Sequence, residues 1–260
     1  MSSFTTVLYE VREGVAHITL NRPERRNAIN ETALVELIAA AQLAARDPAV
    51  RVVLLTGAGD KAFSSGADLS PPGGDGFLAA HEKRGLLPAL FEAFLKLDKP
   101  TVARLAGPAL AGGLGLVLMC DFALAADDVT VGTPEVQRGL MPYMVMALLT
   151  RHVGRKRALE MALLGERYSA AEAVQMGILN RAVPRAELDA AVDLLCARLC
   201  AKSPAILALG KRAFHRIEDM TLADSLEFLR GQLTVNLLCE DAAEGVIAFM
   251  EKRAPDWKGR

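Results

Sequence analysis

A glycine-rich stretch near the middle of the chain, AGPALAGGLGLVLMCD at residues 106–121, constrains the fold more than any other segment. Its apolar pattern is interrupted at Pro108 and at Gly112-Gly113 and then resumes, which predicts a loop that turns into a buried helix. The first N–H groups of such a helix have no partner within it, and they favour an oxygen that becomes anionic during a reaction. The same small residues are also compatible with close packing of a core helix, so this stretch alone leaves both interpretations open.

A second glycine-rich loop lies upstream, directly after an aliphatic run at residues 52–56 that predicts a buried strand. The loop, GAGDKAFSSGADL, lacks the glycine spacing of a dinucleotide fingerprint, and no Gly-Lys-Ser/Thr of a phosphate-binding loop follows it. Ser64-Ser65-Gly66 is not a G-x-S-x-G nucleophile motif, and no histidine lies nearby in the sequence. What remains is a pair of loops that offer backbone donors.

The pattern along the chain predicts alternating strands and helices, followed by a mainly helical part. A hairpin is expected at residues 7–11 and 15–20, and a helix that begins near Asn30 and stops at Asp47-Pro48. Residues 77–97 predict a helix that breaks near Pro88, and from Met144 onward helical patterns dominate. The segment SPPGGDG at residues 70–76 predicts a mobile rim over the ligand site.

The two glycine loops together resemble the paired signature of the crotonase superfamily, the enoyl-CoA hydratase/isomerase enzymes. The similarity covers almost the whole chain. Besides the loops it includes LNRPE and RRNAI at residues 20–29, GTPE at 132–135, LLGERYSAAEAVQMGILNRAVP at 163–184 and EGVIAFMEKR at 244–253. The common order and spacing of these segments carry the resemblance.

The resemblance implies an α/β fold of the ClpP/crotonase type, a spiral of ββα units with a C-terminal helical region that makes trimer contacts. Residues 1–200 are accordingly expected to form the core domain with the acyl-CoA site. Residues 201–260 are expected to form the helical region, which contributes to trimer contacts and covers coenzyme A. A homotrimer or a hexamer, built as a dimer of trimers, follows from the same resemblance.

The resemblance also implies the chemistry of the site. The backbone N–H groups of Ala67 and Gly112 would hold the carbonyl oxygen of an acyl-CoA thioester as an enolate forms, and such donors contribute about 3–4 kcal/mol each. The hydratases of the family carry a glutamate at the position of Gly115, and glycine cannot move a proton. The second glutamate of the family, in a Pro-Glu pair, is present as Glu135. We expect Glu135 to be the single acid/base, with a solvent-facing loop carboxylate as the alternative.

One carboxylate favours a proton shuttle over the addition of water. Glu135 would remove an α-proton from a 3-enoyl-CoA and return it at the γ-carbon, which is double-bond isomerisation in fatty acid metabolism. A first alternative is an enoyl-CoA hydratase, a lyase, in which Tyr143 or a water chain assists Glu135. Tyr143 could equally form an aromatic wall that excludes water. A second alternative is a non-catalytic acyl-CoA-binding protein.

Coenzyme A requires cations for its phosphates and an apolar slot for adenine. Arg25 and Arg26 follow the early motif, and Phe249 and Lys252 match residues by which a neighbouring subunit of the family contacts coenzyme A. Phe249 could instead be a core residue, and Lys252 a solvated charge. The further residues predicted to line the substrate are those of the loops, namely Ala28, Ser65, Gly66, Ala67, Asp68, Leu69 and Gly112.

Composition excludes several other classes of function. The net charge of −1 over 260 residues gives no electrostatic support to nucleic-acid binding. No apolar run reaches the roughly 18 residues of a membrane span, and the N-terminus shows no secretion signal, so a cytoplasmic protein is expected. Four cysteines and four histidines show no metal-binding spacing, and we expect reduced thiols. No metal or cofactor is expected, because coenzyme A is part of the substrate.

Overall fold

A six-stranded sheet forms the centre of the computed structural model, which describes residues 4–69 and 76–260. The strand order is β1-β2-β3-β4-β6-β9, with β1 and β2 antiparallel and all other neighbours parallel. The strands are β1 (Val7–Arg12), β2 (Val15–Leu20), β3 (Val52–Gly57), β4 (Thr101–Leu105), β6 (Phe122–Ala126) and β9 (Arg181–Val183). The predicted hairpin and the predicted strand at residues 52–56 are confirmed. The aliphatic run of β3 is buried because helices cover both faces of the sheet.

A smaller sheet connects the second glycine loop to the segment that carries Glu135. It consists of β5 (Ala109–Leu110), β7 (Thr130–Gly132) and β8 (Arg167–Ser169), with β5 parallel and β8 antiparallel to the central β7. β5 and β8 have two and three residues, too few to show the alternation of apolar and polar side chains that marks a strand, so the sequence does not predict them.

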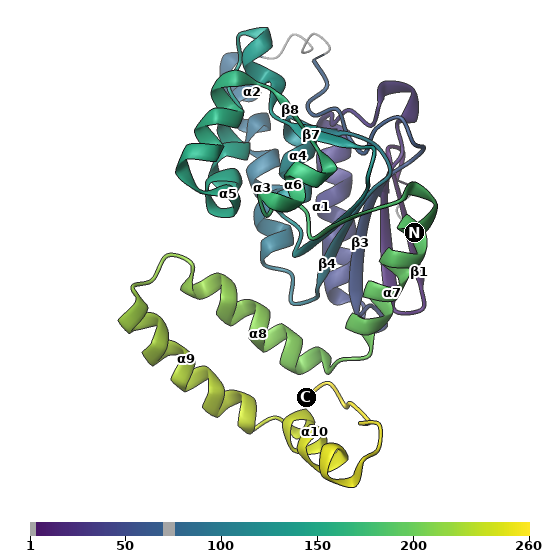
Figure 1. Cartoon of the computed structure of the whole chain (residues 1–260), viewed down its shortest axis with the longest axis vertical. Helices are drawn as coiled ribbons and strands as arrows, with labels where there is room; N and C mark the ends of the chain where they lie inside the picture. The colour runs from purple at the N-terminus through teal and green to yellow at the C-terminus, as the bar shows by residue number, and fades with distance from the viewer. Residues whose placement is uncertain (1–3, 70–75) are drawn as a thin grey trace.

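Among the described residues, seven α-helices precede the last, mainly helical part of the chain. Figure 1 shows α1 and α3 on one side of the main sheet and α7 on the other. The helices are α1 (Glu31–Arg46), α2 (Phe77–Arg84), α3 (Leu86–Leu95), α4 (Gly112–Leu118), α5 (Tyr143–Leu164), α6 (Ala170–Gln175) and α7 (Leu188–Cys200). Helix α1 begins where the sequence predicts, since the side chain of Asn30 accepts a hydrogen bond from the N–H of Ala33 at 2.9 Å.

The predicted helix break near Pro88 is present, three residues before the proline. The helical segment is interrupted at Gly85, and Pro88 is the third residue of α3. Proline is tolerated there because the first-turn N–H groups of a helix have no partner within the helix. The mobile rim predicted at residues 70–76 lies outside the described residues except for Gly76.

The last part of the chain is helical, as predicted, and lies apart from the sheet in Figure 1. It consists of α8 (Pro204–Ile217), α9 (Leu222–Leu237) and α10 (Glu240–Glu251). Its large apolar side chains are widely exposed; the most exposed are Leu222, Leu238, Phe249 and Met250, each 75% or more. Among the described residues, no helix is long and apolar enough to cross a membrane.

The four cysteines do not pair with one another. Cys120 and Cys196 are buried, whereas Cys200 and Cys239 are partly buried, and all four are free thiols. Burial raises the pKa of Cys196 to about 12, which keeps this thiol protonated and unreactive at neutral pH.

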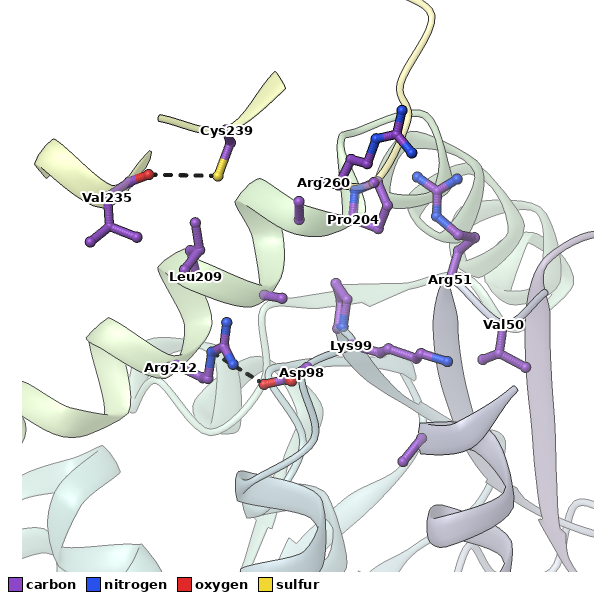
Figure 2. A pocket seen from close by; sticks show the side chains of 15 residues that line it. Val50, Arg51, Asp98, Lys99, Pro204, Leu209, Arg212, Val235, Cys239 and Arg260 are labelled. Carbon is purple, nitrogen blue, oxygen red and sulfur yellow. Dashed lines mark hydrogen bonds and ion pairs between the residues drawn. The ribbon is translucent and has the colours of Figure 1, made fainter. Parts of the chain in front are cut away.

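A partly buried ion pair attaches α8 to the core. Lys211 donates to Oδ2 of Asp121 at 2.7 Å, and the N–H and hydroxyl of Thr101 donate to the same oxygen. Burial acts to raise the pKa of Asp121, but the nearby His215 ring, the charge and hydrogen bond of Lys211 and the hydrogen bond from Thr101 hold that pKa below its usual range. A second ion pair between α8 and the core, Arg212 with Asp98 at 3.5 Å, is solvent-exposed and borders a cavity of about 450 Å³ (Figure 2).

Substitution Asp121→Asn is expected to lower the free energy of unfolding by about 3 kcal/mol at neutral pH, because it leaves the largely shielded Lys211 ammonium without a charged partner, with only the carbonyl of Lys99 as acceptor among the described residues. Since the folded-state pKa of Asp121 is depressed, this contribution is present above the unfolded pKa and is lost as pH falls through the folded value. Urea denaturation between pH 7 and pH 3 measures both effects. Asp98→Asn is the control, and loss of its exposed ion pair should lower the free energy of unfolding by less than about 1 kcal/mol. Equal losses of stability in the two variants would contradict the role of Asp121 and Lys211 in attaching α8 to the core.

Candidate functional site

The two glycine loops lie against each other at the ends of β3 and β4. The N–H of Phe63 donates to the carbonyl of Pro108 at 3.0 Å, and the N–H of Leu110 donates to the carbonyl of Ser64 at 3.0 Å. Gly66 has a φ of +90°, and a Cβ added there would lie 2.6 Å from the Cβ of Ala111. Only glycine permits this approach of the two backbones.

The approach brings two backbone donors together. A Cβ added to Gly112 would lie 3.8 Å from the backbone nitrogen of Ala67, so the two N–H groups border one small space. Within the described part of the chain, neither N–H has a hydrogen-bond acceptor. Gly112 is also the first residue of α4, where the helix dipole adds a positive potential. This geometry suits an oxygen that gains negative charge.

The early motif at residues 20–29 holds the first glycine loop in place. Asn27 is only 1% exposed, and its side-chain amide donates to the carbonyls of Ala58 and Ala62 at 3.0 and 2.8 Å. Ser64 donates its hydroxyl to the carbonyl of Asn27, and Ile29 donates its N–H to the carbonyl of Gly66. Sequence reasoning did not assign this role to Asn27. Its positive φ of 52° and its amide explain why asparagine suits the position.

Two residues predicted to line the substrate are already engaged by Arg22. The guanidinium of Arg22 donates to a carboxylate oxygen of Asp68 at 2.9 Å and to the carbonyl of Ala28 at 2.7 Å. Both charged side chains of the ion pair are 16% exposed. Asp68 therefore rigidifies the loop beside Ala67.

The small sheet positions Glu135 close to the second loop. Leu110 pairs with Gly132 in the β5–β7 ladder, and the N–H of Ala111 donates to the carbonyl of Gly132 at 2.8 Å. Glu135 follows three residues later, in the 3-10 helix of residues Pro134–Arg138. This pairing places the backbone that leads to Glu135 beside the second loop, from a segment more than twenty residues away in sequence.

Glu135 is not a solvent-facing carboxylate. Its Oε2 atom is buried and accepts no hydrogen bond from any described residue. Burial raises the pKa of Glu135, while its own backbone and the charge of Arg138 partly offset that rise. A carboxyl group is suited to taking up and releasing a proton when its pKa is raised and one of its oxygens accepts no hydrogen bond from the protein.

An aromatic ring occupies the space beside Gly115. A Cβ added to Gly115 would lie 2.5 Å from the ζ carbon of Phe91 and 3.3 Å from a methyl group of Val145. Phe91 belongs to α3 and is 6% exposed. A second carboxylate at position 115 therefore needs Phe91 to move.

The other predicted residues lie in two places, at the first loop and at the start of α5. Arg25, Arg26 and Leu69 are exposed, and the carbonyl of Arg26 accepts from the N–H of Ser65 at 3.0 Å, so these side chains border the first loop. Tyr143 is the first residue of α5 and is 70% exposed, with no hydrogen bond to Glu135 among the described residues.

Phe249 and Lys252 do not approach the loops within one chain. They lie at the end of α10, which Figure 1 shows at the opposite end of the molecule from α4. Phe249 is 85% exposed, so it is not a core residue. Within the described residues, no group of three or more His, Cys, Asp or Glu could hold a metal ion.

The α/β core thus carries two backbone N–H groups without an acceptor among the described residues and one partly buried carboxyl group. The model of the enoyl-CoA hydratase/isomerase family matches residues 10–260. The chain belongs to this family, which confirms the predicted superfamily and the α/β crotonase-type fold.

Individual relatives support the same assignment. The chain is 34% identical to 2,3-dehydroadipyl-CoA hydratase of Escherichia coli, covering 96% of this chain and 97% of that protein. It is 35% identical to carnitinyl-CoA dehydratase of Escherichia coli, covering 97% and 98%. The crystal structure of an enoyl-CoA hydratase from Mycobacterium smegmatis superposes with a TM-score of 0.93 at 34% identity, over 97% of this chain and 99% of that one.

Substitution Glu135→Gln is expected to raise the thermal unfolding midpoint at neutral pH. Because the folded-state pKa is raised, the ionised carboxylate destabilises the folded chain above that pKa, and the effect vanishes below the ordinary value of 4.5. Calorimetric scans at pH 4 and pH 8 measure the difference. Glu36→Gln is the control of opposite sign, since hydrogen bonds from Thr5 and Thr6 outweigh burial and lower the pKa of Glu36. A lower midpoint for both variants at pH 8 would refute the assigned environment of Glu135.

Proposed function

We propose that the chain binds an acyl-CoA thioester with its carbonyl oxygen between the N–H groups of Ala67 and Gly112. Both donors lack an acceptor among the described residues and border one space. As a proton leaves the α-carbon, the oxygen becomes an enolate oxyanion, and fixed donors at this point lower the barrier by about 3–4 kcal/mol each.

Glu135 is the proposed acid/base. The single observation that carries this assignment is its buried Oε2 atom, which has no hydrogen-bond partner among the described residues and lies in a carboxyl group of raised pKa. Such a group takes a proton from the α-carbon of a 3-enoyl-CoA and returns it at the γ-carbon, so that the double bond moves into conjugation. Gly115 supplies no second acid, and the ring of Phe91 occupies the space beside it. These observations favour isomerisation.

An enoyl-CoA hydratase is the second candidate, and the relatives favour it. The two Escherichia coli proteins are named as a hydratase and a dehydratase. In this alternative Glu135 activates water with the help of Tyr143 or a second water. The two candidates differ in product, because hydration gives a 3-hydroxyacyl-CoA and isomerisation leaves the mass of the substrate unchanged.

Glu135→Gln is expected to reduce turnover by a factor of roughly 10²–10⁴ while acyl-CoA affinity changes little, since the amide keeps the shape but carries no transferable proton. Turnover is followed by mass spectrometry and ultraviolet absorbance with 3-enoyl-CoA and 2-enoyl-CoA, and affinity by calorimetry with a saturated acyl-CoA. The matched control is Glu166→Gln, because Glu166 is an exposed glutamate directly before β8. Full activity of Glu135→Gln would exclude Glu135 as the proton carrier.

We further propose a homotrimer, or a dimer of trimers, in the cytoplasm. The exposed apolar side chains of α9 and α10 need a covering surface, and Phe249 and Lys252 can contact coenzyme A only at the site of a neighbouring subunit. Arg25 and Arg26 would meet the phosphates from the subunit that carries the loops.

The double substitution Phe249→Ala and Lys252→Ala is expected to weaken coenzyme A binding about tenfold or more, because it removes an apolar contact and a cation from the neighbouring subunit. Sedimentation equilibrium should give three or six subunits for the unaltered chain. Met250→Ala is the control, since its side chain is similarly exposed on the same helix. A monomer with undiminished coenzyme A affinity would refute both the assembly and the shared site.

A further inference from the structure

Phe91 lies between the space beside Gly115 and a large cavity. On one side, its ζ carbon reaches the space beside Gly115. On the other, Phe91 lines a cavity of about 1030 Å³ that lies between α3, the end of α4, α5 and α8. The proposed chemistry at Glu135 uses neither the ring nor the cavity.

The cavity is mainly apolar where it meets the core. Leu118 and Met119 contribute from the end of α4, Leu95 from α3, and Leu148 from α5. The side facing α8 carries the partly buried pair of Asp121 and Lys211. A hydrocarbon chain is the ligand class that fits the apolar part, because its burial is favourable and it requires no hydrogen bonds.

Helix α4 leads from the donors to this cavity. Gly112 and Gly115 are three residues apart and therefore lie on one face of the helix. Leu118 follows after three more residues, so the donors and the cavity are about 9 Å apart along the axis. The ring of Phe91 and the methyl groups of Val145 stand at the intermediate position, beside Gly115.

We propose that Phe91 limits the length of the acyl chain by closing the passage from the oxyanion site to the cavity. The inference rests on the proposed function, which places the thioester oxygen at Ala67 and Gly112. A short acyl group ends before the ring, whereas a longer one meets it. Gly115 is needed for the same restriction, because any side chain at this position would displace the ring of Phe91.

The first test is calorimetry with butanoyl-, hexanoyl- and decanoyl-CoA, which are saturated and do not react. In the unaltered protein, affinity is expected to stop rising beyond the shorter chains. Phe91→Ala opens the passage, and two further buried methylenes then increase decanoyl-CoA affinity about tenfold or more, with butanoyl-CoA changed less than about twofold. Phe91→Leu keeps more of the core volume and should increase decanoyl-CoA affinity by a smaller factor than Phe91→Ala does.

Phe94→Leu is the matched control for Phe91→Leu. It removes the same ring from the same helix, but Phe94 is fully buried in the core and does not line the cavity. The same dependence of affinity on chain length in the unaltered protein and in both Phe91 variants overturns this inference and leaves the proposed function intact. Absence of acyl-CoA binding by the unaltered protein overturns the proposed function, and this inference with it.

A second test needs no ligand. Gly115→Ala should lower the thermal unfolding midpoint, because its Cβ would lie 2.5 Å from the ring of Phe91. Combining it with Phe91→Leu should recover part of the loss, as expected for residues in contact. Strictly additive effects would show that the ring does not occupy the space at Gly115, and the passage would then be open.

Discussion

The close approach of two backbones at Gly66 and Ala111 is the constraint on which the site depends. A side chain at position 66 would separate the loops, since its Cβ would lie 2.6 Å from that of Ala111. With the loops in contact, the N–H groups of Ala67 and Gly112 face one space, and hydrogen bonds within the two loops do not use them. Asn27 and Arg22 fix the first loop from outside by binding its carbonyls and Asp68.

The acidic group comes from a different part of the chain and is delivered by a very short strand pairing. Two residues of β5 pair with β7, and Glu135 follows β7 in a 3-10 helix, in a partly buried position. Burial raises the pKa of Glu135, so the same packing that positions the carboxyl group also makes it a better proton acceptor. The ring of Phe91 occupies the space beside Gly115, so the structure is apolar at this position.

The C-terminal helices depend on the core at a few points and leave much apolar surface exposed. Asp121, three residues beyond the end of α4, accepts from Lys211 of α8 and from Thr101 of β4. The same aspartate thus connects the segment of the oxyanion donors to the helical region. Trp257 returns to the core and donates to the carbonyl of Ala201 at 2.9 Å, which fixes the end of the chain near the start of α8.

Local periodicity, caps and ordered motifs indicate the family, the hairpin, the helix that begins after Asn30 and the helical C-terminal part without any structure. The resemblance also indicated Ala67, Gly112 and Glu135 as one site. The buried Oε2 atom of Glu135, the hydrogen bonds by which Asn27 secures the loop, and the position of Phe91 beside Gly115 are visible only in the folded chain. The helix break expected near Pro88 lies at Gly85, because proline is tolerated in the first turn of a helix. The contacts of Asn27 with Ala62 and of Phe91 with Gly115 join residues 35 and 24 positions apart in sequence, which no local pattern specifies.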